Sequence, residues 1–373
     1  MRHRHHDSLA FTVVVTILVV LCAVPVAVVV ALSGAPGTML LAILLAALPV
    51  GPLVASYLWL DRYEPEPRWL LAAGLLWGGA VATVGSVLLG GLGGLVVGVS
   101  EATALVVLAP VSEELTKGAF LVLLVWWRRH EVDGLLDGLV YAGMVGIGFA
   151  FVENILYLAA AYDGAEGFGP GGAAAVTTTF VMRALISPFA HPLFTAFIGI
   201  GVGIAVGSRK VGVRFLAPVA GYVLAVIAHA LWNGATLTGG AGFLGVYVAI
   251  MLPAFVVLAT VAVWLRSRER EMLHAALLDA SRRGLVPASD IPHLVGLRAR
   301  RNARAWAFRQ GGREARRRVS DYQQAAIELG FLHHRYLRGT PPRDFRPRGR
   351  AHVERMRAIR PHIDFPGQVV PTR

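Results

Sequence analysis

Apolar segments long enough to cross a bilayer follow one another through the first two-thirds of the chain, from Ala10 to Trp264. Each is about 20 residues or longer, which suits a hydrocarbon core of roughly 30 Å, whereas a soluble core helix seldom stays apolar beyond ~14 residues. Only 16% of the 373 residues are charged, well below the roughly 25% that is typical of soluble domains. This region is therefore predicted to be an all-α polytopic membrane protein.

Eight transmembrane helices are expected in this region. Their ranges are Leu9–Leu32, Thr38–Leu60, Trp69–Val99, Thr103–Trp127, Leu135–Ala161, Ala174–Val206, Val213–Leu237 and Phe243–Leu265. The basic residues of the short connections are Arg2, Arg4, Arg62, Arg68, Arg128, Arg129, Arg209, Lys210 and Arg214. All of them fall on one side of such a topology, and connections rich in Lys and Arg stay in the cytoplasm. Both termini are therefore predicted to be cytoplasmic.

The composition changes abruptly after Leu265, so residues 1–265 form the expected transmembrane domain and residues 266–373 a cytoplasmic tail. The tail holds 24 Arg against 10 Asp and Glu. Helical patterning over Glu269–Ser281, Ile291–Phe308 and Glu314–Leu337 predicts a helical tail. Anionic lipid attracts such a segment by roughly 1 kcal/mol per close cation. Nucleic acid is not an expected partner, because no recognisable binding motif accompanies the charge.

Ionisable side chains inside the expected spans are costly in lipid, so each is a candidate functional group. The fourth span carries Glu113, Glu114 and Lys117. The lysine lies four and three residues after the two carboxylates, on the same helix face, and can pair with either. Such a pair suits a general base that takes a proton from water. The alternative is a buried ion pair that only locks the helices together.

Further polar residues occur in the next three spans. The fifth holds Phe149, Glu153 and Asn154; the sixth holds Arg183, Ser187, His191 and Thr195; the seventh holds His229 and Asn233. Pro188 and Pro192 flank His191, and broken helices at membrane depth usually line a polar cavity. We expect Arg183 to clamp Glu153, and Ser187 and Thr195 to orient His191. A Glu–Asn pair alone is as often a simple polar contact that holds two helices together as it is a functional pair.

The similar depth of these groups favours one shared site over separate polar contacts between helices. At 1.5 Å of rise per residue, Glu113, Glu153, His191 and His229 all lie roughly 12–25 Å below the non-cytoplasmic surface. The segment from residue 110 to residue 238 therefore contains the whole candidate site. The single cysteine, Cys22, lies far from it, which excludes disulfides and a Cys-based metal site.

These motifs, taken together, resemble those of the PrsW family of intramembrane proteases, which is distantly related to the CAAX-processing membrane proteases. The motifs are E-E-x-x-K at Glu113–Lys117, F-x-x-x-E-N at Phe149–Asn154, the isolated His191 and H-x-x-W-N at His229–Asn233. The resemblance implies a metalloprotease of the cell membrane that cleaves membrane-anchored proteins, with an anti-sigma factor as the substrate of site-1 cleavage. It implies that Glu113, Glu114, His191 and His229 are catalytic and that Asn233 polarises the scissile carbonyl.

Two mechanisms remain open from the residues. In one, His191 and His229, together with Glu153 or one of the pair Glu113 and Glu114, hold a metal such as Zn²⁺ that polarises the carbonyl and activates water. In the other, Glu113 activates water directly, while a histidine and Asn233 stabilise the oxyanion. Because no H-E-x-x-H helix is present, spacing alone does not establish the metal. A proton-coupled transporter and a non-catalytic scaffold are the alternatives to a protease.

Overall fold

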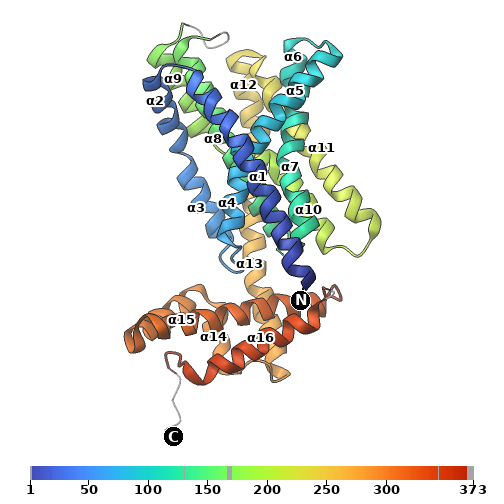
Figure 1. The fold of residues 1–373 in the computed structure, drawn as a ribbon, viewed down its shortest axis with the longest axis vertical. Coiled ribbons are helices and arrows are strands. Elements are labelled where there is room, and N and C mark those ends of the chain that lie inside the picture. The colour runs from blue at the N-terminus through green and yellow to red at the C-terminus, as the bar shows by residue number, and fades with distance from the viewer. Residues whose placement is uncertain (1, 130, 166–169, 343, 368–373) are drawn as a thin grey trace. The chain divides into compact units, whose positions relative to one another are not determined.

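The computed structural model describes residues 2–129, 131–165, 170–342 and 344–367. Two compact units are formed: Met1–Asp61 with Glu66–Ala262, here called the bundle, and Arg62–Pro65 with Val263–Arg373, here called the tail unit. The end of the tail, residues 368–373, and part of the connection at 162–172 lie outside the described residues. The described chain is helical throughout (Figure 1), so the all-α prediction is confirmed.

The helices of the bundle follow the predicted spans closely. In chain order they are α1 (Arg2–Leu32), α2 (Pro36–Ala47), α3 (Val50–Leu60), α4 (Arg68–Leu76), η1 (Trp77–Ala82), α5 (Thr83–Val97), α6 (Glu101–Thr103), η2 (Ala104–Leu108), α7 (Ala109–Arg128), α8 (Leu135–Asp163), α9 (Gly172–Phe180), η3 (Val181–Ile186), α10 (Ala190–Gly207), α11 (Val211–Thr236), α12 (Gly239–Val246), η4 (Tyr247–Met251) and α13 (Leu252–Arg282). The η elements are π-helical turns inside longer helices, a feature that is frequent at functional sites.

Seven helices of the described chain are long and apolar enough to cross a membrane, and each covers a predicted span. The predicted span at Thr103–Trp127 is helical through α6, η2 and α7 but is not among the seven. It carries Glu113, Glu114 and Lys117, which lower its apolar character. The count of eight spans and the cytoplasmic side of both termini stay predictions.

Helices α8 and α10 form the interior of the bundle, with most of their residues buried. Glycines allow them to approach closely. A Cβ on Gly138 would lie 2.1 Å from the carbonyl oxygen of Gly199, and one on Gly148 would lie 1.8 Å from that of Leu75. Small residues at helix contacts are the usual means of close packing in lipid.

The tail unit combines the end of α13 with η5 (Ala288–Asp290), α14 (Ile291–Val295), α15 (Leu297–Leu337), α16 (Phe345–Ile359) and η6 (Arg360–His362). Its apolar core includes Leu273, Leu277, Leu294, Tyr322 and Phe365. The tail is therefore a packed helical unit, as the patterning predicts.

One predicted helix in the tail was wrong. Helix Ile291–Phe308 is interrupted at Gly296, which has an extended backbone, so α14 ends and α15 begins there. The predicted break before Glu314 is present, because Gly311 and Gly312 have non-helical backbone angles and divide α15 into two helical segments. Gly312 has a φ of 66°, which only glycine adopts readily.

Candidate active site

The carboxylate pair and the lysine of α7 form the buried centre of the bundle. The Nζ atom of Lys117 lies 2.8 Å from Oε1 of Glu114 and 3.2 Å from Oε2 of Glu113. Lys117 and Glu114 are fully enclosed, whereas the Glu113 side chain keeps 12% of its surface exposed. The pairing that the helical spacing predicts is present. A buried lysine between two carboxylates offsets their mutual repulsion, which would otherwise be severe in a medium of low dielectric constant.

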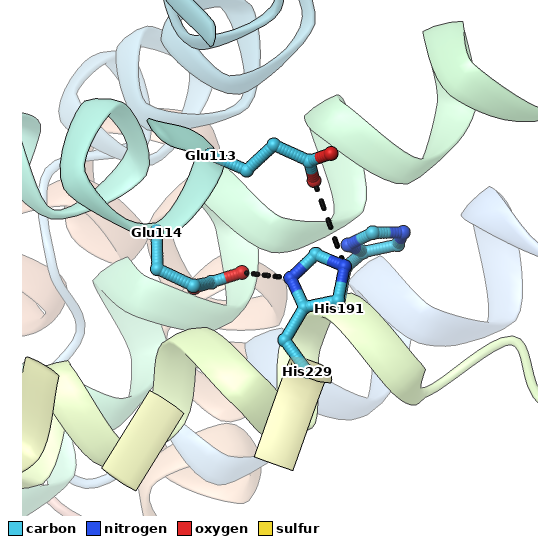
Figure 2. A group of neighbouring side chains, drawn as sticks. All are labelled: Glu113, Glu114, His191 and His229. Atoms are coloured by element: carbon cyan, nitrogen blue, oxygen red, sulfur yellow. Dashed lines mark hydrogen bonds and ion pairs between the residues drawn. The ribbon is translucent and has the colours of Figure 1, made fainter. Parts of the chain in front are cut away.

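His229 of α11 lies beside both carboxylates (Figure 2). Its Nδ1 lies 3.0 Å from Oε1 of Glu114, and its Nε2 lies 3.8 Å from Oε2 of Glu113. A carboxylate only accepts hydrogen bonds, so Nδ1 carries the proton and donates to Glu114. In a neutral ring Nε2 then carries no proton, and its lone pair points toward Glu113.

His191 begins its helix immediately after the break that the two prolines predict. Helix η3 ends at Ile186, Ser187 leaves the helical region with φ of −125° and ψ of 39°, and α10 begins at Ala190. The hydroxyl of Tyr247 donates to the carbonyl of Ile186 at 2.8 Å. That bond satisfies a backbone acceptor at the break, as membrane depth requires.

The ring of His191 connects Lys117 to a third carboxylate. Its Nδ1 lies 3.0 Å from Nζ of Lys117, and its Nε2 lies 2.6 Å from Oε2 of Glu153 on α8. An ammonium group has no acceptor, so Nδ1 must accept, and the Nε2 proton is donated to Glu153. Gly146 makes this approach feasible, because a Cβ there would lie 2.9 Å from the backbone carbonyl of His191.

Glu153 and Asn154 are both held by Arg183 of η3. The guanidinium forms an ion pair with Glu153, and its Nε donates to Oδ1 of Asn154 at 2.7 Å. The predicted clamp of Glu153 by Arg183 is therefore present. Arg183 also stacks on Tyr157 at 3.9 Å from the ring centre, a contact that sequence reasoning missed although Tyr157 lies one helical turn after Glu153.

Two expected orienting contacts to His191 were wrong. The hydroxyl of Thr195 donates to Oε2 of Glu114 at 3.0 Å, and that of Ser187 donates to the carbonyl of Met182 at 2.7 Å. Thr195 lies in α10, whereas Ser187 lies in the break between η3 and α10. The helical break, however, turns Ser187 back toward its own backbone, where it satisfies a carbonyl.

Aromatic rings enclose the charged centre on two sides. Nζ of Lys117 lies 3.8 Å from the ring centre of Phe149, and Phe149 is 5.2 Å from the ring of His191. Phe194 stacks on His229 with ring centres 4.7 Å apart. The sequence analysis included Phe149 through its motif but missed Phe194, whose only signal is its position three residues after His191.

Asn233 lies away from these groups. Its side-chain amide donates to the carbonyl of Leu105 in η2 at 2.9 Å and joins α11 to that helix. Trp232, next to it, lines a cavity of about 10 Å³ with Asn154, Arg183 and His191. A cavity of this size is close to the minimum that holds one water molecule.

Four of these residues form a set of donors that suits a metal ion. Glu113, Glu114, His191 and His229 each offer one ligand atom, and these atoms all lie within 4.8 Å of one another. Carboxylate oxygen and imidazole nitrogen are ordinary zinc ligands. Glu114 and Glu153 each accept a hydrogen bond from one of the two histidines, which fixes the tautomer and orientation of each ring. Glu153, predicted as a ligand, is not in the set of four and bonds to His191 instead.

The fold and this centre define a polytopic membrane protein with a buried Glu–His–Lys cluster. Residues 66–258 match the model of the family described as PrsW family intramembrane metalloprotease. The match covers more than half of the chain, and the chain belongs to that family. It is also 31% identical over 159 residues to "Protease PrsW" of Geobacillus kaustophilus. The match covers 42% of this chain and 64% of that protein. No solved structure matches.

Proposed function

We propose that this chain is an intramembrane endopeptidase that hydrolyses membrane-anchored protein substrates in the cell membrane. The observation that carries the proposal is the convergence of Glu113, Glu114, His191 and His229 inside a bundle of spanning helices. Membership of the PrsW family supports the same conclusion. An anti-sigma factor with a single span is the substrate that we expect for site-1 cleavage.

The two carboxylates have different surroundings, which assigns them different roles. Glu114 is fully buried and accepts hydrogen bonds from Lys117, Thr195 and His229. Glu113 has the single close partner Lys117 among the described residues, at 3.2 Å, and keeps a partly exposed side chain. Glu113 is therefore the general base that takes a proton from the attacking water. Glu114 holds His229 and Lys117 in place.

The ammonium of Lys117 stabilises negative charge as it develops on the scissile carbonyl. Its three donors go to Glu113, Glu114 and Nδ1 of His191 in the structure, so the bond to Glu113 or to His191 is exchanged for one to the oxyanion. A positioned donor of this kind is worth about 10²–10³ in rate where water is excluded. Protonated Glu113 then gives its proton to the leaving amine, and the products are a neutral amine and a carboxylic acid, which exchange a proton to become the ammonium and the carboxylate. Asn233 polarises the scissile carbonyl only if its hydrogen bond to the carbonyl of Leu105 opens.

The metal that the family description implies would be held by Glu114, His191 and His229, with Glu153 orienting the ring of His191 and Glu113 remaining the base. When bound, Zn²⁺ supplies Lewis-acid polarisation and lowers the pKa of a bound water. We expect purified protein to contain about one equivalent of metal and His191→Ala to lose it, as measured by elemental mass spectrometry. Metal-free wild-type protein with full activity in chelator would refute the metal-dependent form.

The tail unit is proposed to contact anionic lipid through its arginines. Its apolar side chains are gathered in the core, which leaves charged groups such as Arg268, Arg283 and Arg318 exposed. Vesicles that contain phosphatidylglycerol should bind the protein more weakly when several exposed tail arginines are changed to Gln.

The class of activity is tested by comparing membrane proteins in cells that express wild type or Glu113→Gln. A protease generates new amino termini in one or a few single-span proteins, and these are found by mass spectrometry of labelled termini. We expect such termini with wild type and with the exposed control Glu101→Gln, and none with Glu113→Gln. Identical termini in all three strains would refute the proposal in favour of a transporter or a scaffold.

A further inference from the structure

The helix that carries the carboxylate pair changes its hydrogen-bond register just before it reaches the pair. At the end of the π-helical turn η2, the backbone N–H of Ala109 donates to the carbonyl of Ala104, five residues earlier. The next residue, Pro110, has no backbone N–H. The carbonyl of Leu105, five residues before Pro110, is therefore left without a donor from its own helix.

Asn233 of α11 supplies the missing donor. Its side-chain amide lies 2.9 Å from the carbonyl oxygen of Leu105, a residue 128 positions away in the sequence. Leu105 belongs to the predicted span Thr103–Trp127, and a backbone acceptor without a partner is strongly unfavourable in lipid. Proline is tolerated in a spanning helix where a neighbouring helix satisfies the acceptor that the proline leaves free. Asn233 therefore does for η2 what a backbone N–H at position 110 would do in an uninterrupted helix.

The same face of α11 carries His229, one helical turn before Asn233. His229 donates to Glu114 of α7, whereas Asn233 donates to Leu105 of η2. The two side chains thus attach α11 on both sides of the change in register. Leu105 lies nine residues before Glu114, a rise of about 13 Å along the helix axis. The amide of Asn233 is therefore engaged at a distance from the carboxylates that hold His229 and activate water.

We propose that Asn233 is a positioning residue: it replaces the N–H that Pro110 lacks, fixes the start of α7 and so holds the carboxylate pair against His229. The inference rests on the proposed function, because it concerns the placement of the base and its partners. It differs from the role that the motif resemblance implies, in which Asn233 polarises the scissile carbonyl. In the role proposed here, the amide of Asn233 acts on the backbone of η2 and does not touch the substrate.

The test is single-turnover cleavage of single-span peptides by the full chain in nanodiscs. Asn233→Ala should cleave up to about 100-fold more slowly, because a misplacement of about 1 Å can cost that factor. Loss of an oxyanion donor has a similar cost, so this variant alone does not separate the two roles. The double variant Asn233→Ala/Pro110→Ala gains a backbone N–H at position 110 for the freed carbonyl and should recover most of the lost rate. A donor to the scissile carbonyl would not be restored in this way.

Tyr222 of α11 provides the matched control. Its hydroxyl donates to the carbonyl of Val111 in α7 at 2.9 Å, so Tyr222→Phe also removes one bond between α11 and the helix of the carboxylate pair. Val111 keeps its helical donor, the N–H of Leu115. No acceptor is left free, and the rate of Tyr222→Phe should stay close to that of wild type. Equal losses in Tyr222→Phe and Asn233→Ala would overturn the proposal, because the replaced N–H would then have no special importance.

Thermal unfolding of the same proteins without substrate separates a failure of this inference from a failure of the proposed function. Asn233→Ala should lower the unfolding temperature, and the double variant should restore it. A double variant that is no faster or no more stable than Asn233→Ala would overturn the proposal. Recovery of stability without recovery of rate would also overturn it, because Asn233 would then act on the substrate directly. If wild type cleaves none of the peptides, the proposed function fails, while the unfolding temperatures still decide whether Asn233 replaces the missing N–H.

Discussion

The bundle and the tail unit expose opposite kinds of side chain. In the bundle, residues such as Leu95 and Val96 are 84% exposed, while Lys117 and Glu114 are fully enclosed. In the tail unit, Leu277 and other apolar residues are enclosed and arginines face outward. The hydrophobic effect orders the tail unit as it does any soluble domain. It supplies little force between helices that already lie in hydrocarbon, so the bundle depends on close packing and on polar contacts.

This difference explains how the bundle can carry a charged centre. Lys117 forms two ion pairs and contacts His191 and Phe149. Within the tail unit, the buried Asp290 has a similar role on a smaller scale, because it accepts bonds from Arg360 and Tyr322. In both of these clusters, each enclosed charge contacts a partner of opposite sign.

Removing the central cation should have the largest effect. We expect Lys117→Met to lower the free energy of unfolding of the bundle by about 3–5 kcal/mol, because two or three buried carboxylates then lack their partner. Proteolysis should also be lost. The measurement is thermal unfolding of the protein in nanodiscs, with the exposed Lys210→Met as the matched control. Equal unfolding of both variants would show that the centre does not hold the bundle together.

A cavity in the apolar core should have the next largest effect, and only in the tail unit. Leu277→Ala is expected to lower the local free energy of unfolding by about 2–5 kcal/mol. Amide hydrogen exchange of the full chain measures this for residues 318–332. The neighbouring Leu278 is 38% exposed, and its change to Ala should have less than half of the effect. Increased exchange in α8 or α10 as well would argue that the two units do not unfold separately.

Disrupting the close packing of the bundle should have an intermediate effect on its free energy of unfolding. Gly148→Ala places a Cβ against the carbonyl of Leu75 and should cost about 1–3 kcal/mol. Gly91 has no atom within 4 Å of an added Cβ, so Gly91→Ala should be neutral or slightly stabilising. Thermal unfolding in nanodiscs measures both. If the two variants behave alike, glycine is not needed for the contact between α8 and α4.

The smallest expected effect is a dependence of the stability of the tail unit on pH. Burial tends to raise the pKa of Glu328, but hydrogen bonds from His352 and Gln324 outweigh it and hold the pKa below its ordinary value. Because the folded-state pKa is depressed, the stabilisation is present above pH 4.5 and is lost as the pH falls through the lower folded value. The side chain is 34% exposed, so we expect less than about 1 kcal/mol.

Hydrogen exchange in α15 and α16, corrected for the intrinsic pH dependence, measures this loss. Glu328→Gln should remove it, since the amide does not titrate. An unchanged acid dependence in that variant would assign the effect to another group.

The sequence predicts the parts of the site that lie within one helix, and predicts the contacts between helices less completely. The spacing of Glu113 and Lys117 predicts their ion pair, because three or four residues make one helical turn. Similar depth predicts that His191 and His229 approach the pair. Depth does not, however, specify which ring atom meets which carboxylate. The contact of Thr195 with Glu114 joins residues 81 positions apart, and it depends on how the break at Ser187 rotates α10.

For the fold, too, the sequence predicts some features well and others poorly. Long apolar segments predict the spans because their length has to match the bilayer. The ends of α14 and α15 were misplaced because Gly296 was read as part of a continuous helical pattern, and a single glycine is not a sufficient signal for a break. The adjacent glycines Gly311 and Gly312 are a stronger signal, because both have non-helical backbone angles and divide α15 close to the predicted break between Phe308 and Glu314.

The central claim is that Glu113 takes the proton from the water that hydrolyses the substrate. Its most direct test is single-turnover cleavage of a panel of single-span peptides by purified protein in nanodiscs, with wild type, Glu113→Gln and Glu101→Gln compared at equal folded fraction. A general base contributes about 10²–10⁴ in rate, so Glu113→Gln should cleave at least 100-fold more slowly while Glu101→Gln matches wild type. Cleavage by Glu113→Gln at more than a tenth of the wild-type rate would contradict the account.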